Sequence, residues 1–114
     1  MNYRIVLDPP FQKEVKRLSK KYKSFKADLL KFQEELLLNP TAGIHLGGNI
    51  RKVRMAIGSK GRGKSHGARV ITVTISMDIE NAEINLLFIY DKAERDNISS
   101  KEIIALIKEV GLDI

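Results

Sequence analysis

The stretch GSKGRGKS, at residues 58–65, matches the pattern G-x-x-x-x-G-K-[ST] of nucleotide-binding phosphate loops. In such a loop the backbone amides hold the phosphates, and the N-terminus of a helix that follows directly completes the anion site. An apolar run that reaches Asp91 also looks like the acidic strand that accompanies these loops. The residues after Ser65 nevertheless predict a strand, because residues 71–75 are all β-branched. We therefore expect a loop between two strands that binds neither ATP nor GTP.

Lysine and arginine surround this loop, and no acidic residue lies near it in the sequence. Residues 36–77 contain seven Lys or Arg and no Asp or Glu, whereas residues 78–114 are acidic overall. Solvated surface side chains are one interpretation. A field of one sign around a glycine loop also attracts phosphate-rich partners, through counterion release and steering. The residues that we expect to bind RNA phosphates there, or only to keep the loop solvated, are Lys60, Arg62, Lys64 and His66.

Length and composition predict one soluble domain over residues 1–114. Hydrophobic residues make up 43% of the chain, and no run reaches the roughly 20 apolar residues of a membrane span. The start of the chain does not resemble a secretory signal. The chain has no cysteine, and His45 and His66 lack companions at metal-ligand spacing. We expect a cytoplasmic protein without a metal or cofactor.

The spacing of apolar residues predicts three amphipathic helices. Asp8 is expected to cap the first, which carries two prolines in its first turn. Ser24 begins the second, which stops before an Asn-Pro pair and should form a hairpin with the first. Ser99 and Glu102 form a capping box for the last helix, which ends at Gly111. Its apolar residues occupy more than one stripe, so part of this helix could contact a partner or lie in a two-sided core.

Four strands are expected around these helices, in the order β-α-α-β-β-β-α. The first is short and alternates over residues 3–7. The other three are expected at residues 50–57, 68–75 and 83–90, and a polar turn at residues 77–82 joins the last two. This order and length describe a small α+β domain.

Two stretches at these positions are RKVRMAIGSKGRGKSHGARVITV, residues 51–73, and LLFIYDKAERDNIS, residues 86–99. In this order they resemble the RelE/ParE superfamily of bacterial toxins, closest to RelE-like and HigB-like members. The resemblance implies a small twisted antiparallel sheet with helices packed against it, mRNA cleavage on the ribosome, inhibition of translation and a cognate antitoxin. This chain departs from many relatives at His66, where they have glycine. It also has Ala68 at a position where the family often has an aromatic residue, which could stack on a base.

RNA cleavage without a metal requires a deprotonated 2′-hydroxyl, a stabilised pentacovalent phosphate and a protonated 5′-oxygen. Guanidinium groups can bind the dianionic transition state, and a lysine among other cations becomes a better base. Lys52 and Arg54 lie two apart on one face of their strand. By the resemblance, they match, with Arg69, the basic residues around the scissile phosphate, and Lys92 and Arg95 match basic positions after the last strand.

Other interpretations stay open at this point. Lys52 and Arg54 could be the solvated face of a strand, and Arg69 could pair with Asp91 or Glu94 at the rim of the core. A ParE-type gyrase inhibitor has the same fold without nuclease activity, and a plain RNA-binding module would bind without cutting. We predict the endoribonuclease, and we expect its antitoxin to be acidic in the toxin-binding segment, because the cationic segment would attract it.

Overall fold

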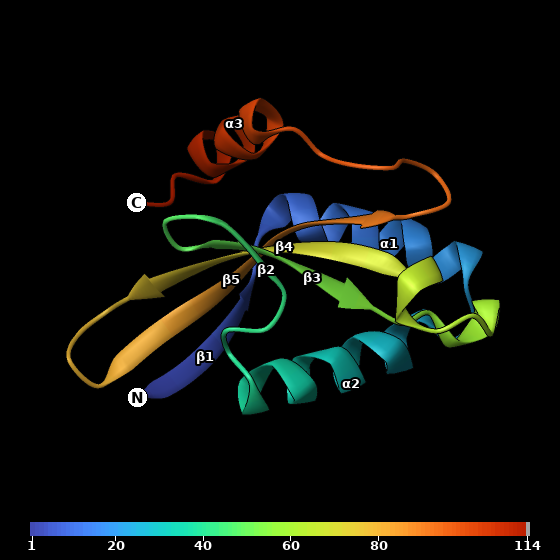
Figure 1. Ribbon diagram of the computed structural model, residues 1–114, viewed down its shortest axis with the longest axis horizontal. Helices are drawn as coiled ribbons and strands as arrows, with labels where there is room; N and C mark the ends of the chain where they lie inside the picture. The colour runs from blue at the N-terminus through green and yellow to red at the C-terminus, as the bar shows by residue number, and fades with distance from the viewer. Residues whose placement is uncertain (114) are drawn as a thin grey trace.

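Three helices cover the two faces of a five-stranded sheet in the computed structural model, which describes residues 1–113 (Figure 1). The elements are, in chain order, β1 (Asn2–Leu7), α1 (Pro9–Lys21), α2 (Phe25–Leu38), β2 (Ile44–Gly47), β3 (Ile50–Met55), β4 (Ala68–Ser76), β5 (Asn81–Asp91) and α3 (Ser100–Val110). Two short 3-10 turns, η1 (Gly58–Lys60) and η2 (Lys64–His66), lie between β3 and β4. The predicted α+β class and the three predicted helices are confirmed.

The sheet differs from the predicted one in two details. Its strand order is β1-β5-β4-β3-β2, and β1 runs parallel to β5, so the sheet is mixed and not purely antiparallel. Parallel strands need a long connection, which the α1–α2 hairpin and three further strands provide between β1 and β5. The second detail is β2, which the sequence did not predict. All four of its residues are exposed and one of them is glycine, so it lacks the alternation of a half-buried strand.

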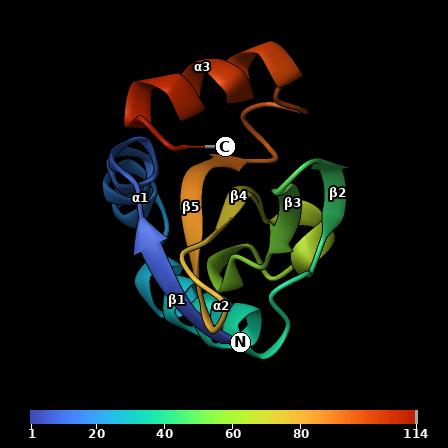
Figure 2. The ribbon, with the colours of Figure 1, turned by 90° about the vertical axis from the view of Figure 1, so that its left-hand side faces the viewer.

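The sheet separates two hydrophobic cores. On one face, Phe11 and Leu18 of α1 and Phe25, Phe32 and Leu36 of α2 pack against the strands. On the other face, Ile103 and Ile107 of α3 pack against Ile71, Val73 and Leu87. Figure 1 shows α2 below the sheet and α3 above it, and Figure 2 shows α1 next to β5. A β-bulge at residues 86–88 of β5 interrupts the normal alternation, so that the consecutive residues Leu87 and Phe88 both contact the core under α3, whereas Leu86 and Ile89 lie in the other core.

The helix ends confirm the sequence interpretation at α3 and contradict it at α1. Ser99 and Glu102 form the predicted capping box, and Gly111 ends α3 with a φ of 81°. Asp8 occupies the predicted N-cap position of α1, and its carbonyl oxygen accepts from the amide of Gln12 at 2.9 Å, but its side chain accepts no hydrogen bond from the helix. Pro10, at the second helical position, has no N–H, which removes one of the two usual donors to an N-cap side chain. The carboxyl of Asp8 is 4% exposed, and burial raises its pKa to about 6.

The apolar excess predicted for α3 divides between the core and the surface. Ile103 and Ile107 are buried, whereas Ile104 is 50% exposed. Ile104 and Leu46 line an apolar hollow between α3 and the β2–β3 hairpin. The two-sided core therefore explains part of the excess, and an accessible apolar surface remains.

Candidate functional site

Basic side chains from four segments, β3, η2, β4 and the turn after β5, meet in a cleft beside β3 and β4. The cleft has a volume of about 460 Å³, and its basic lining residues are Lys52, Arg54, Lys64, Arg69 and Lys92. The two-residue spacing places Lys52 and Arg54 on one face of β3, and the antiparallel register puts Arg54 directly beside Arg69 of β4. The structure thus brings together all four residues predicted as catalytic, with one of the predicted loop cations.

Arg69 is buried and keeps its charge without a carboxylate partner. The residue is 7% exposed. Its two Nη atoms donate to the carbonyl oxygens of Lys64, Ser65 and Ala68 at 3.1–3.2 Å. Among residues 1–113, no carboxylate lies within 4.0 Å of the guanidinium of Arg69 or Arg54. Burial, and then repulsion from Arg54, lower the pKa of Arg69. The alternative in which Arg69 pairs with Asp91 or Glu94 is therefore wrong.

Two of the three lysines of the cleft, Lys52 and Lys92, also have mainly neutral partners. Lys52 Nζ donates to Oδ1 of Asn97 at 3.0 Å. Lys92 Nζ donates to the carbonyl oxygen of Asp96 at 2.8 Å and lies 3.9 Å from the exposed carboxylate of the same residue. Asn97 was part of the family-like stretch in the sequence, but nothing local predicted that it would contact β3. These positions leave both ammonium groups available to an anion in the cleft.

The glycine loop does not have the geometry of a nucleotide phosphate loop. Ser65 lies within the single turn η2, and only His66 and Gly67 separate it from strand β4, so no α-helix opens at the motif. The expected loop between two strands is confirmed. Gly63 has a φ of 71°, which favours glycine, and a Cβ at Gly67 would collide with the carbonyl oxygen of Met55. These two glycines fold the loop closely against the end of β3.

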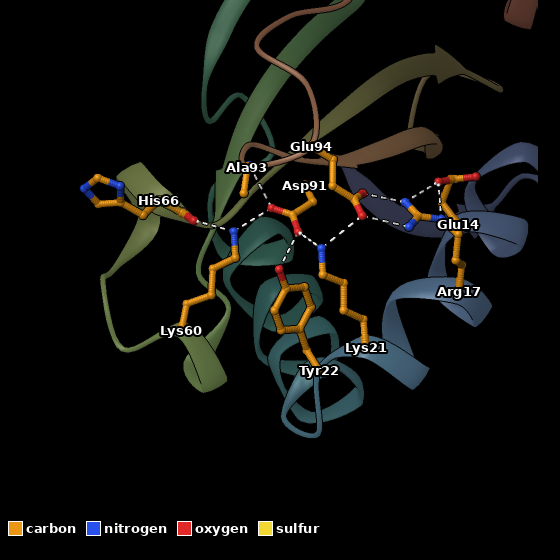
Figure 3. A network of polar contacts seen from close by, with 9 residues as sticks. All are labelled: Glu14, Arg17, Lys21, Tyr22, Lys60, His66, Asp91, Ala93 and Glu94. Carbon is orange, nitrogen blue, oxygen red and sulfur yellow. Dashed lines mark hydrogen bonds and ion pairs between the residues drawn. The ribbon is translucent and has the colours of Figure 1, made fainter.

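Lys60 anchors the loop in a network of polar contacts outside the cleft (Figure 3). Its Nζ donates to Oδ1 of the fully buried Asp91 at 2.5 Å and to the carbonyl oxygen of His66 at 2.9 Å. Asp91 also accepts from the hydroxyl of Tyr22, from Lys21 and from the amide of Ala93. Burial alone would raise the pKa of Asp91, but the hydrogen bonds outweigh it and lower the pKa to about 2. This carboxylate therefore stays ionised.

A family model for the RelE toxin of the RelE / RelB toxin-antitoxin system matches residues 11–112. The chain belongs to the RelE family. The resemblance read from the sequence is thereby confirmed, and the protein is the toxin component of a toxin-antitoxin system with a cognate antitoxin as its partner. None of the helices in the part of the chain described here has the length and apolar character to cross a membrane.

The remaining predicted residues of this RelE-family toxin lie outside the cleft. Arg62 and His66 are exposed on the loop, and the ring of His66 points away from the network in Figure 3. Arg95 lies over the ring of Tyr90, with 5.6 Å between its Cζ and the ring centroid, and donates to Glu102 at 2.7 Å. Lys64 is the exception, because it lines the cleft and forms only an exposed pair with Glu35 at 3.3 Å.

Tyr90 is a neighbour of the site that sequence reasoning missed. It pairs with Arg69 across β4 and β5 and is 2% exposed, and its hydroxyl has no hydrogen-bond partner within residues 1–113. Burial raises its pKa, so the hydroxyl keeps its proton. In the sequence this tyrosine ends an apolar run and reads as an ordinary core residue, which is why no local signal singled it out.

Proposed function

We propose that this RelE-family toxin is a ribosome-dependent mRNA endoribonuclease that inhibits translation through metal-independent cleavage by Lys and Arg side chains. The observation that supports this most is the adjacent pair Arg54 and Arg69, neither with a carboxylate within 4.0 Å in residues 1–113. Two neighbouring guanidinium groups repel each other until an anion binds between them. A pentacovalent phosphate, which carries two negative charges, fits this requirement.

The proposed reaction uses the 2′-hydroxyl of the RNA as its nucleophile. Lys52, in its neutral form, accepts the hydroxyl proton, and the 2′-oxygen then forms a bond to phosphorus. The bond from phosphorus to the 5′-oxygen breaks, and Lys92 donates a proton to that oxygen. Arg54 and Arg69 donate hydrogen bonds to the non-bridging oxygens throughout. The products are a 2′,3′-cyclic phosphate and a 5′-hydroxyl, and the two protons transferred balance each other.

The loop cations extend the same positive surface beyond the cleft. Lys64 lines the cleft, and Arg62, two residues before it, is exposed. We propose that these two side chains bind phosphates of the messenger or of ribosomal RNA, with His66 and Arg95 further from the reacting atoms. Such contacts contribute affinity that falls as the salt concentration rises.

The antitoxin is proposed to neutralise this surface with an acidic segment. Residues 36–77 contain seven cations and no Asp or Glu, and within residues 1–113 only Lys60 and Lys64 of these cations pair with a carboxylate, so five remain for an acidic chain. Binding would then occupy the contacts that RNA phosphates need. The measurement is the affinity for the protein encoded beside this gene, with rising salt and with added RNA. Weaker binding in both conditions is expected, and a ternary complex with RNA still in the cleft would contradict competition.

The test of the activity is primer extension on a translated message, with purified protein and active ribosomes. Wild-type protein should produce discrete cleavage sites, and Arg69→Ala should reduce cleavage by about 100-fold or more, as loss of a transition-state hydrogen-bond donor does. Arg17→Ala is the matched control, because Arg17 is an exposed cation paired with Glu14 and Glu94. Absence of cleavage together with inhibition of gyrase supercoiling would identify a ParE-type inhibitor. RNA binding without cleavage would identify a binding module.

A further inference from the structure

Backbone carbonyls of the glycine loop hold the guanidinium of Arg69. The carbonyl oxygens of Lys64 and Ser65 accept from Nη1 and Nη2 at 3.1 and 3.2 Å. A carboxylate in this position would orient the guanidinium equally well but would neutralise it. Carbonyl dipoles orient the group and leave its full charge for a bound anion. The position of the Arg69 guanidinium therefore depends on the position of the glycine loop, which has glycine at positions 58, 61, 63 and 67.

The loop is attached at two places on the far side from the cleft. At its start, the amide of Gly58 donates to Asp28 at 2.9 Å, and the amide of Ser59 donates to the hydroxyl of Ser24 at 2.8 Å. At its middle and end, Lys60 links the buried Asp91 to the carbonyl oxygen of His66 (Figure 3). The ammonium of Lys60 thus connects the end of β5 with the turn η2 that supplies the carbonyls for Arg69.

We propose that Lys60 and Asp91 are positioning residues for Arg69, acting through the glycine loop. This rests on the proposed function, in which Arg69 contacts the phosphate. The Lys60–Asp91 pair fixes η2, and η2 presents the carbonyl oxygens of Lys64 and Ser65 at the distances that hold the guanidinium in the cleft. The pair itself lies outside the cleft, and its charges cancel. Lys60 is thereby assigned a different role from the phosphate contact that its sequence position predicted.

The same network contains a matched control. Glu94 accepts from Arg17 and Lys21 of α1, and within residues 1–113 it forms no hydrogen bond or ion pair with the glycine loop. Glu94→Gln removes one acid of the network and leaves the Lys60–Asp91 pair in place. Lys60→Met is the test variant, because methionine keeps most of the apolar stem and removes the ammonium. In this variant Asp91 still accepts from Tyr22, Lys21 and the amide of Ala93, so the buried carboxylate stays hydrogen-bonded. Removing one partner of a buried ion pair costs about 3 to 5 kcal/mol, so the assays are run under conditions in which circular dichroism shows the variant to be folded.

The deciding experiment is a double-mutant cycle on cleavage by ribosome-bound toxin, with folding checked by circular dichroism. Lys60→Met should lower kcat by about 10- to 100-fold with little change in KM, because misplacement of a catalytic group by about 1 Å costs roughly that much. In an Arg69→Ala background it should have no further effect, since it acts through Arg69. Glu94→Gln should leave kcat unchanged. The proposal would be overturned if Lys60→Met lowered kcat equally in both backgrounds, or if it raised KM and left kcat unchanged.

A second measurement separates this proposal from the proposed function. A guanidinium held by several carbonyls rotates slowly, so its Nη hydrogens should give resolved NMR signals in the wild-type protein. Lys60→Met should broaden or merge the signals of Arg69, and Glu94→Gln should leave them unchanged. If the wild type fails to cleave any translated message, the proposed function is lost, and the NMR result still decides whether Lys60 positions Arg69. Unchanged Arg69 signals in Lys60→Met would refute the positioning role.

Discussion

Two groups of cations in this toxin have the same residue types and opposite electrostatic surroundings. In the paired group, each cation contacts at least one carboxylate; its cations are Arg17, Lys21 and Lys60, and its acids are Glu14, Asp91 and Glu94. In the cleft group, which consists of Lys52, Arg54 and Arg69, no member has a carboxylate within 4.0 Å in residues 1–113. The two groups lie at opposite sides of one glycine loop.

The difference shows how a surface rich in Lys and Arg divides between structure and function. A paired cation contributes little to binding an outside anion, because its charge is already compensated. An unpaired cation interacts strongly with a bound anion, especially where a second cation lies beside it, because no protein carboxylate compensates its charge. The charge of a side chain therefore says less about function than the charges that surround it.

The largest effect is expected from removing one guanidinium of the cleft group. Arg54→Ala should reduce cleavage by about 100-fold or more, because the transition state loses a charged hydrogen-bond donor. Stability should change by less than about 1 kcal/mol, since Arg54 is exposed and repels Arg69. Arg17→Ala, the paired counterpart, should keep full activity. Kinetics on ribosome-bound mRNA and urea unfolding measure both quantities, and equal activity losses in the two variants would end the distinction between the groups.

Acid should act on the paired group through its buried carboxylate. The pKa of Asp91 is lowered to about 2 in the folded protein, from an ordinary value of 3.8. Its contribution to the free energy of unfolding is therefore complete above pH 3.8 and is lost as the pH falls toward 2, by up to about 2 kcal/mol. Urea unfolding between pH 4 and 2 tests this.

The control for the acid experiment is Asp8. Burial raises its pKa to about 6, so Asp8 lowers stability as the pH rises from about 4 to 6, which is the opposite sign. Variants separate the contributions of Asp8 and Asp91 to the free energy of unfolding below pH 4. Asp8→Asn should leave the loss below pH 4 in place. The double variant Lys60→Met/Asp91→Asn should reduce this loss and leave only the part that comes from other carboxylates such as Glu94, whose pKa Arg17 and Lys21 also lower to about 2. An undiminished loss in the double variant would assign the acid sensitivity to those other groups alone.

Converting a cleft cation into a paired one should have a smaller effect on activity. Asn97→Asp would place a carboxylate beside Lys52, whose Nζ already donates to Asn97 Oδ1 at 3.0 Å. The carboxylate favours the charged ammonium, which cannot accept a proton, so kcat should fall about tenfold at neutral pH and recover at higher pH. A pH–rate profile of wild type and variant measures this shift. An unchanged profile would show that Lys52 is not the base.

The smallest effect is expected from removing an exposed acid of the paired group. Glu94→Gln breaks the contacts with Arg17 and Lys21, whose side chains are 48% and 44% exposed. Exposed ion pairs contribute about 0.2 to 1 kcal/mol each, so the loss of both pairs should lower the free energy of unfolding by about 2 kcal/mol or less. Urea unfolding at low and high salt should show this difference shrinking with salt. A loss above about 2 kcal/mol would mean that Glu94 supports the fold as Asp91 does.

The sequence by itself determined the features that depend on neighbours within one turn or one strand. The apolar spacing of α1 and α2 and the β-branched run of β4 predicted their elements. The Ser99 capping box and Gly111 predicted the ends of α3. The two-residue spacing of Lys52 and Arg54 predicted their common face. These signals are local, because helix and strand periodicity and capping involve residues a few positions apart.

Only the tertiary structure decided which cations are paired and which strands pair at the edges of the sheet. Lys60 reaches Asp91 across 31 positions, Lys21 reaches it across 70, and the guanidinium of Arg69 is held by a loop whose path no periodicity predicts. The parallel pairing of β1 with β5 and the fully exposed edge strand β2 likewise depend on chain folding at long range. The physical reason is that Coulomb interactions and strand pairing follow distance in space, whereas the sequence shows only distance along the chain.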